Sequence, residues 1–173
     1  RLTLQHTVPV VLFEPNHLLL LSGAPDQRRN YLDDLLEQLH ANHAAMRRNY
    51  RRLLAQRNAL LKRAHKPSNE ELFPWNLRLS ELGALLARRR AELCQQIDAR
   101  IGAVYHDLSG VSTQVNLHYQ AQFSLETYET QLLHKLEASL ATDLLRGFTA
   151  AGPHREDMLP LFNGRPAEEV ASR

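Results

Sequence analysis

The residues that could do chemistry in this chain do not assemble into a complete active site in the sequence. Nine histidines invite a metal-site interpretation, and His40 and His43 are close enough to share a helix face. Glu37 is three residues before His40 but six before His43, so it does not complete a compact site with both. A structural role for these histidines is favoured, and we expect no metal ion.

The single cysteine and the polar motifs offer no candidate for nucleophilic or phosphoryl chemistry. Cys94 lies between apolar Leu93 and polar Gln95, without a helix N-terminus to lower its pKa, so we expect an inert thiol. One cysteine cannot form an internal disulfide, which favours the reducing cytoplasm. The 173 residues contain no Gly-x-x-x-x-Gly-Lys-Ser/Thr loop and no close Ser/His/Asp or paired-carboxylate arrangement. The sequence therefore predicts no catalytic residue.

Basic side chains are concentrated in one block, although the net charge of the chain is only +2. Residues 47–66 hold eight Lys and Arg and no Asp or Glu. Four of these form two i,i+4 pairs on adjoining helix faces: Arg47, Arg48, Arg51 and Arg52. Their charges repel unless an anionic partner or carboxylates of an opposing helix lie beside them, and both interpretations remain open. The candidate carboxylates are Glu70, Glu71, Glu81 and Glu92.

Composition describes a helix-rich globular chain. Apolar residues make up 43% and charged residues 23%, which excludes a wholly disordered chain, and only 6% of residues are aromatic. No apolar run approaches the length of a membrane span, and no signal-peptide pattern is visible. The chain begins with Arg1 and not with Met, which favours a piece of a longer protein.

Apolar periodicity changes from strand-like to helical near the start of the chain. Residues 2–13 alternate and are β-branched, which predicts a strand. Residues 27–39 follow a helical period after Asp26, which we expect to be the N-cap. The pattern weakens at residues 40–43, where we expect a bend, and then resumes until Pro67 stops it.

A longer helix is predicted over residues 75–105, after a linker at residues 68–74. Its apolar seam has heptad-like steps: Leu79, Leu82, Leu86, Leu93, Ile97, Ile101 and Val104. One such stripe does not stabilise a helix alone, so we expect an antiparallel arm formed with residues 46–61. We expect Leu53, Leu60, Leu82, Leu86 and Leu93 to be buried in it.

The last third of the chain returns to mixed structure. Residues 114–119 alternate as in a strand, and residues 127–146 follow a helical period that Gly147 ends as a C-cap. Asn163-Gly164 is a strong signal for a hairpin turn. The predicted fold class is therefore mainly α with minor β (α+β), with helices between two regions of strand.

Two segments are more specific than this periodicity. The first runs from Phe13 to Asp33 and reads F-x-P, then G-x-P-x-x-R-R-x-x-L-D, with Arg28 and Arg29 as its basic pair. The second is Gly152-Pro153-His154-Arg155-Glu156-Asp157. With the run Gln56–Lys62 and with Trp75, Leu79 and Leu82-Gly83, they resemble the bacterial RecF family. Its members are recombination mediators with an ABC-type ATPase head related to SMC proteins.

The resemblance implies a domain layout in which a long antiparallel helical arm is inserted between strands of an ABC-type head that is incomplete here. Residues 1–25 would form a strand and loop of the head. Residues 26–146 would form the arm, with its short strand near 114–119. Residues 147–173 would supply return strands and a hairpin, and would end at the start of the signature motif.

The resemblance also implies which site residues are present. Ser172 and Arg173 look like the start of the signature motif of the ATP site, and without the residues that follow we expect Ser172 to be idle. Gly152, Pro153, His154, Arg155, Asp157, Arg28 and Arg29 belong to family motifs of unassigned role. Glu14-Pro15-Asn16 stands where many ABC heads carry a metal-contacting Gln. Walker A and Walker B are not found, so these residues alone are not expected to be an enzyme.

The function implied by the resemblance is DNA repair and replication. A protein of this family would bind ATP with Mg, would bind single- and double-stranded DNA, and would form an ATP-dependent homodimer. It would act in the cytoplasm with other recombination mediators. Together they would load recombinase at single-strand gaps during recombinational repair and the SOS response. Arg47, Arg48, Arg51 and Arg52 would then be DNA-binding candidates, which contact phosphates without reading bases. The alternative is a coiled-coil interaction module of another SMC-like protein without a nucleotide role.

Overall fold

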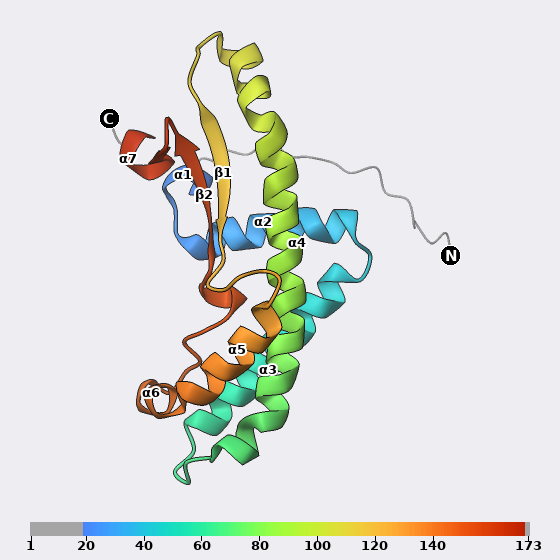
Figure 1. Ribbon diagram of the computed structural model, residues 1–173, viewed down its shortest axis with the longest axis vertical. Coiled ribbons are helices and arrows are strands. Elements are labelled where there is room, and N and C mark those ends of the chain that lie inside the picture. The colour runs from blue at the N-terminus through green and yellow to red at the C-terminus, as the bar shows by residue number, and fades with distance from the viewer. Residues whose placement is uncertain (1–18, 172–173) are drawn as a thin grey trace.

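The computed structural model describes residues 19–171. One long helix, α4 (Asn69–Ser109), runs through the molecule, and the other elements are arranged along it (Figure 1). It follows α1 (Leu19–Ser22), α2 (Pro25–Leu39) and α3 (His43–Leu61). The chain continues through β1 (Val115–Gln120), α5 (Tyr128–Ala138) and α6 (Leu140–Arg146). It ends with the 3-10 turn η2 (Pro153–Arg155), β2 (Asp157–Phe162), β3 (Arg165–Pro166) and α7 (Ala167–Ala171). The strand predicted at residues 2–13 lies outside the described residues, as do Ser172 and Arg173.

The antiparallel arm is confirmed. α3 and α5 both pack against α4, and α3 runs opposite to it (Figure 1). Leu86 and Leu93 are buried as predicted, whereas Leu53, Leu60 and Leu82 are only half-buried. Val104, expected in the same seam, is 53% exposed, because α4 extends past α3 and α5 and packs there against β1.

The predicted linker at residues 68–74 is wrong, because α4 already begins at Asn69. Ser68 and Glu71 form a capping box: the Glu71 N–H donates to Ser68 Oγ, and the Ser68 N–H donates to Glu71 Oε2 at 2.8 Å. Two backbone donors are thereby satisfied at the helix start. Pro74 removes only one backbone hydrogen bond near this end, and the helix continues through it.

The boundaries of two other helices also differ from the prediction. α2 starts at Pro25 with Ala24 as N-cap, so Asp26 lies in the first turn and is not the cap. Proline suits this first position because its φ is already helical. The helix predicted over residues 127–146 is divided at Ser139, whose hydroxyl donates to the Lys135 carbonyl at 2.6 Å and competes with the backbone bonds. Gly147 ends α6 in the left-handed conformation, as expected.

A three-stranded antiparallel sheet with the order β1-β2-β3 lies along the distal half of α4 (Figure 1). The hairpin turn predicted at Asn163-Gly164 is confirmed, and both residues have positive φ, of 50° and 75°. β1 and β2, which the predicted boundary at residue 147 assigns to different domains, pair along their whole length. The sheet therefore joins the end of the arm to the C-terminal segment.

Candidate functional site

The two segments singled out in the sequence meet in the structure. Arg28, on the first turn of α2, donates from Nε and Nη2 to the two carboxylate oxygens of Asp157, at 2.9 and 2.6 Å. Arg29 donates from Nη1 to the main-chain carbonyl of Glu156 at 2.7 Å. The hydrogen bonds that Arg28 donates to Asp157 and the charge of that carboxylate raise the pKa of Arg28 despite burial. The basic pair therefore attaches α2 to the start of β2.

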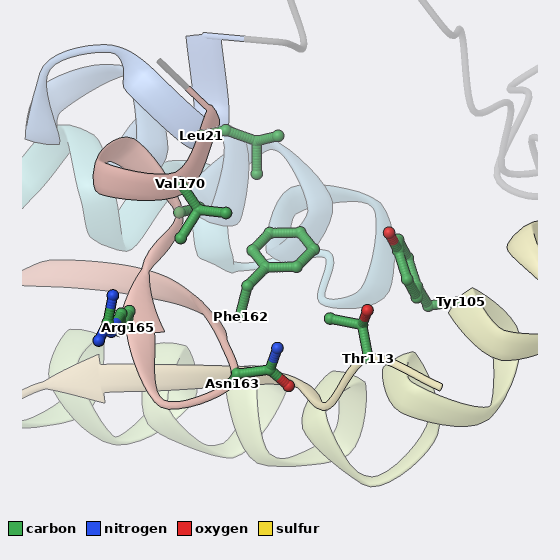
Figure 2. A pocket seen from close by; sticks show the side chains of 8 residues that line it. Leu21, Tyr105, Thr113, Phe162, Asn163, Arg165 and Val170 are labelled. Carbon is green, nitrogen blue, oxygen red and sulfur yellow. The ribbon is translucent and has the colours of Figure 1, made fainter. Parts of the chain in front are cut away.

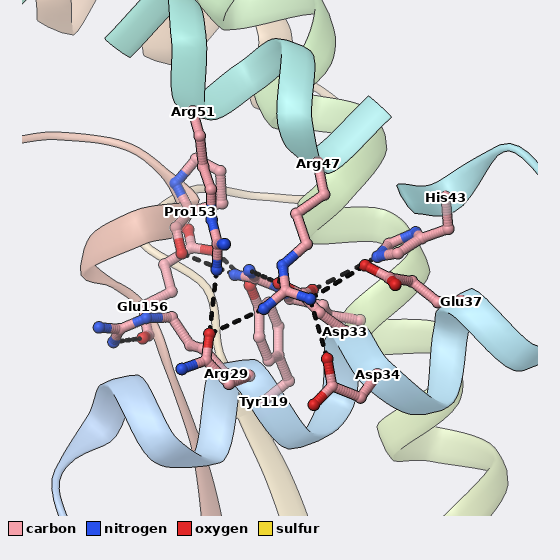
Figure 3. Close-up of polar contacts among 12 residues, drawn as sticks. Arg29, Asp33, Asp34, Glu37, His43, Arg47, Arg51, Tyr119, Pro153 and Glu156 are labelled. Carbon is pink, nitrogen blue, oxygen red and sulfur yellow. Dashed lines mark hydrogen bonds and ion pairs between the residues drawn. The ribbon is translucent and has the colours of Figure 1, made fainter. Parts of the chain in front are cut away.

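Asp33 is the centre of an ion-pair cluster one turn further along α2 (Figure 3). Arg90 of α4 donates to both of its carboxylate oxygens at 2.9 Å, and Arg47 Nε lies 2.9 Å from Oδ2. His43 Nε2 is 3.4 Å from Oδ1. Burial favours a higher pKa for Asp33, but the hydrogen bonds from His43 and Arg90 and the charge of Arg47 together hold the pKa well below its ordinary value. Asp33 is therefore ionised although it is buried.

The Gly-Pro-His-Arg segment fits closely against this cluster. Gly152 has φ 125°, and a Cβ there would lie 2.7 Å from the Tyr50 hydroxyl, so only glycine suits the position. The carbonyl of Pro153 accepts a hydrogen bond from Arg90 Nη1 at 2.7 Å. Arg155 lies over the ring of Phe148, 4.8 Å from its centroid.

His154 is neutral in this environment. Its Nε2 lies 3.1 Å from the Thr149 carbonyl, which can only accept, so Nε2 carries the proton. Nδ1 then accepts from the Tyr50 hydroxyl at 2.8 Å. Burial lowers the pKa of His154 to about 4, helped by the charges of Arg155, Arg29 and Arg90. This histidine is thus a structural hydrogen-bonding residue.

A second buried charge lies in the part of the arm where α3, α4 and α6 meet. Arg57 is fully buried and donates to Asn76, Asp143 and Thr149, at 2.8, 2.8 and 2.7 Å. These partners come from α4, from α6 and from the segment before Gly152. The run Gln56–Lys62 therefore contributes a polar connection that holds α3, α4 and α6 together.

The four basic candidates of α3 divide into two kinds. Arg47 forms ion pairs: its Nη1 donates to Asp34 and Glu37 at 2.9 and 3.0 Å, in addition to the contact with Asp33. The carboxylates thus come from α2, and not from the four glutamates of α4 that the sequence suggested. Arg51 is exposed and donates to the Asn30 side chain at 3.0 Å. Arg48 and Arg52 are exposed on the outer side of α3.

Arg90 and Arg57 are important residues that the sequence reasoning missed. A signal was available for each. Arg90 lies four residues after Leu86 and three before Leu93, so it occupies a position of the apolar seam. Arg57 stands at the same spacing between Leu53 and Leu60. A charged residue on an otherwise apolar helix face indicates a buried partner.

Two cavities show what the surface can accommodate. One of about 620 Å³ lies between α1, the end of α4, the β2–β3 turn and α7, and its walls are mostly apolar (Figure 2). Phe162, Leu21 and Val170 point into it (Figure 2). The other, of about 300 Å³, is lined by four arginines: Arg29, Arg47, Arg51 and Arg90. The second is chemically suited to anions, and within residues 19–171 no group of three His, Cys, Asp or Glu could hold a metal.

Known proteins similar in sequence to this chain include several DNA replication and repair proteins. The chain is 34% identical to the DNA replication and repair protein RecF of Geobacter sulfurreducens over an alignment of 164 positions, which covers 91% of this chain and 44% of the relative. It is 32% identical to RecF of Beutenbergia cavernae over an alignment of 193 positions, which covers 94% of this chain and 49% of the relative. The chain belongs to the RecF family. It spans about half the length of the curated RecF relatives that it matches.

Solved RecF structures have the same fold. The recombination mediator protein RecF solved with ATPrS superposes with a TM-score of 0.84 at 24% identity, over 93% of this chain and 45% of that one. The RecF–ATP structure gives 0.83, over 91% of this chain and 44% of that one. The predicted fold class, mainly α with minor β and with a long antiparallel helical arm, is thereby confirmed. No protein-family model matches the chain. Among residues 19–171, no helix is both long and apolar enough to cross a bilayer.

Proposed function

We propose that this chain forms the helical arm and adjoining head strands of a RecF-type DNA repair and replication protein, which helps to load recombinase at single-strand gaps. The observation that carries the proposal is the similarity, over 91% and 94% of the chain, to proteins named DNA replication and repair protein RecF. The ion pairs between Arg28 and Asp157 support it, because they join the two segments on which the RecF resemblance depends. The alternative, a coiled-coil module of another SMC-like protein, has no comparable support.

In this proposal the longer protein binds ATP with Mg and acts as an ATP-dependent homodimer beside other recombination mediators in the cytoplasm. The similar RecF structures were solved with ATP and with ATPrS, which supports the nucleotide. Ser172 and Arg173 would be the first residues of the signature motif. The boundaries at residues 25/26 and 146/147 between head and arm belong to the same proposal.

DNA would contact the outer side of α3. Arg48 and Arg52 are exposed there one helical turn apart, and duplex DNA presents closely spaced phosphate charges that such a pair can contact. Arg47, although also a candidate, has only 12% of its side chain exposed and is paired with three carboxylates. We therefore assign the phosphate contacts, to single- and double-stranded DNA alike, to Arg48 and Arg52.

The test reverses charge on α3 without disturbing the Asp33 cluster. In the full chain, Arg48→Glu with Arg52→Glu should weaken the binding of labelled duplex and single-stranded DNA for all sequences alike. The slope of log affinity against log salt should become shallower by roughly one unit per lost phosphate contact. Arg100→Glu, an exposed change on the distal half of α4, is the control and should leave both unchanged. Unaltered affinity and slope in a folded double variant would refute a DNA interface here.

The ATPase part of the proposal gives a separate expectation. The 173 residues contain neither a Walker A loop nor a recognised Walker B strand, so this chain alone should not hydrolyse ATP. Phosphate release should be followed at increasing concentrations of the purified chain. Turnover that rises with chain concentration and survives repurification would contradict the expectation.

A further inference from the structure

The arginine-lined cavity of about 300 Å³ is a place where positive charge is gathered and partly shielded from water. It opens between α2 and α3, with α4 and His154 as its floor. Four of its lining residues are arginines, and two are aspartates, Asp26 and Asp33. The functions proposed above use the outer side of α3 and do not use this cavity.

Two of the four guanidinium groups are neutralised by carboxylates. Arg90 has Asp33 as a bidentate partner at 2.9 Å. Arg47 is shared between Asp33, Asp34 and Glu37, at 2.9 to 3.0 Å. The charges of Arg90 and Arg47 are therefore already compensated within the fold.

The other two, Arg29 and Arg51, have only neutral partners among the described residues (Figure 3). Arg29 donates to the Glu156 carbonyl at 2.7 Å, and Arg51 donates to the Asn30 amide oxygen at 3.0 Å. Neither makes an ion pair within residues 19–171. Each guanidinium has five N–H donors, so most of the donors on both remain for a ligand.

The surroundings of Arg29 add a reason for an anion. Burial lowers its pKa, and the neighbouring charge of Arg90 lowers it further, although Asp157 and Asp26 oppose this. A half-buried cation beside a second cation is less stable than the same group in water. A negative group bound in the cavity would remove that penalty.

We infer that the cavity is a seat for a phosphate group, held by Arg29 from α2 and Arg51 from α3. Planar guanidinium forks match the oxygens of a phosphate group in paired hydrogen bonds, which a point charge cannot do. The volume accommodates one phosphate group and several water molecules, since one water molecule takes about 30 Å³. The seat connects two helices that otherwise meet here through the Asp33 cluster, so occupancy tightens the contact between α2 and α3.

The same chemistry has two sources, a phosphate of a nucleic-acid backbone or a free phosphate compound such as a nucleotide. This site does not include Arg48 or Arg52. Loss of phosphate binding in the cavity and loss of DNA binding on the outer side of α3 are therefore measured independently. The probe for the site itself is inorganic phosphate, compared with chloride at equal ionic strength. A short single-stranded oligonucleotide and ATP are then tested as competitors to distinguish the two sources.

The experiment measures phosphate binding by calorimetry and by thermal unfolding of the full chain. Phosphate should bind saturably and raise the melting temperature, and Arg29→Gln or Arg51→Gln should weaken binding about tenfold or more, as expected for lost charge-assisted hydrogen bonds. Arg100→Gln, an exposed arginine on α4 outside the cavity, should bind as the parent does. Arg29→Lys keeps the charge without the fork, and should fold and bind with intermediate affinity.

Circular dichroism of each variant establishes that it is folded before binding is compared. Equal phosphate binding by the parent, Arg29→Gln and Arg51→Gln would overturn the inference, as would the absence of saturation in the parent. If the oligonucleotide displaces phosphate from the parent, the source is a nucleic-acid backbone. If ATP alone displaces it, the source is a free nucleotide, and the seat is confirmed in both cases.

Discussion

Arg90 of α4 and Asp33 of α2 form a buried bidentate ion pair, with Nε and Nη2 each 2.9 Å from a carboxylate oxygen. Asp33 is only 1% exposed and also faces Arg47 Nε and His43 Nε2. One carboxylate thus compensates cationic or polar groups from α3 and α4. Arg90 in turn bonds the Pro153 carbonyl, so the pair links α2, α4 and the Gly-Pro-His-Arg segment.

Replacing this carboxylate by an amide should therefore be costly. Asp33→Asn leaves Arg90 buried without its counter-charge and removes one of the three carboxylates beside Arg47, and we expect a loss of about 3–5 kcal/mol in the free energy of unfolding. Asp34→Asn is the matched control: its side chain is 66% exposed, and we expect a loss below about 1 kcal/mol. Urea unfolding followed by circular dichroism measures both. Equal losses in the two variants would show that the buried cluster is not the source of the stability.

Arg57 gives a second test of buried charge. Arg57→Met removes the partner of Asp143 and takes away the donor that serves the acceptor oxygens of Asn76 and Thr149, so we expect about 3–5 kcal/mol of destabilisation. Adding Asp143→Asn removes the uncompensated charge and should recover part of the loss. A double variant that is less stable than Arg57→Met would contradict this account. The readout is the denaturation midpoint at constant slope.

The stability of the fold should fall as the solution becomes moderately acidic. The pKa of His154 is lowered to about 4 in the folded chain, so the unfolded chain binds this proton first as pH falls. The contribution of His154 is complete above its ordinary pKa near 6.5, declines as pH decreases, and is lost when pH passes through about 4. The full effect is at most ~3 kcal/mol.

The measurement is the free energy of unfolding at several values of pH between 7 and the folded-state pKa of about 4. His154→Gln should unfold with a smaller pH dependence than the parent over this window. His134→Gln changes an exposed histidine and should retain the dependence of the parent. Parallel curves for the parent and His154→Gln would disprove the assignment.

Adjacent leucines of α4 provide the test of the arm. Leu86 is 1% exposed and Leu85 is 46% exposed. Leu86→Asp places an unpaired charge in the core and should unfold the arm, since burying an unpaired carboxylate costs roughly several kcal/mol. Leu85→Asp, with the same change of side chain, should shift the melting temperature only slightly. An unchanged melting temperature for Leu86→Asp would refute the packing of α3 and α5 on α4.

Much of the fold was accessible from the sequence because its signals are local. The seam through Leu79, Leu86 and Leu93 predicted a long helix and its antiparallel partner. Asn163-Gly164 predicted the hairpin, because two consecutive residues that tolerate positive φ suit that turn. The start of α4 was misplaced although its signal is local as well: the capping box of Ser68 and Glu71 starts the helix inside the segment that was predicted as a linker.

The polar site was decided by tertiary structure. Arg28 and Asp157 are 129 residues apart, and their pairing depends on where the fold brings α2 and β2. The basic block of α3 illustrates the same limit, since the carboxylates beside Arg47 come from α2 and not from α4. The sequence by itself determined the helices, the turn and which faces are apolar, because these depend on residues a few positions apart. Which charges neutralise one another, and which arginines remain free for a ligand, depends on elements distant in the chain that only the packed core brings together.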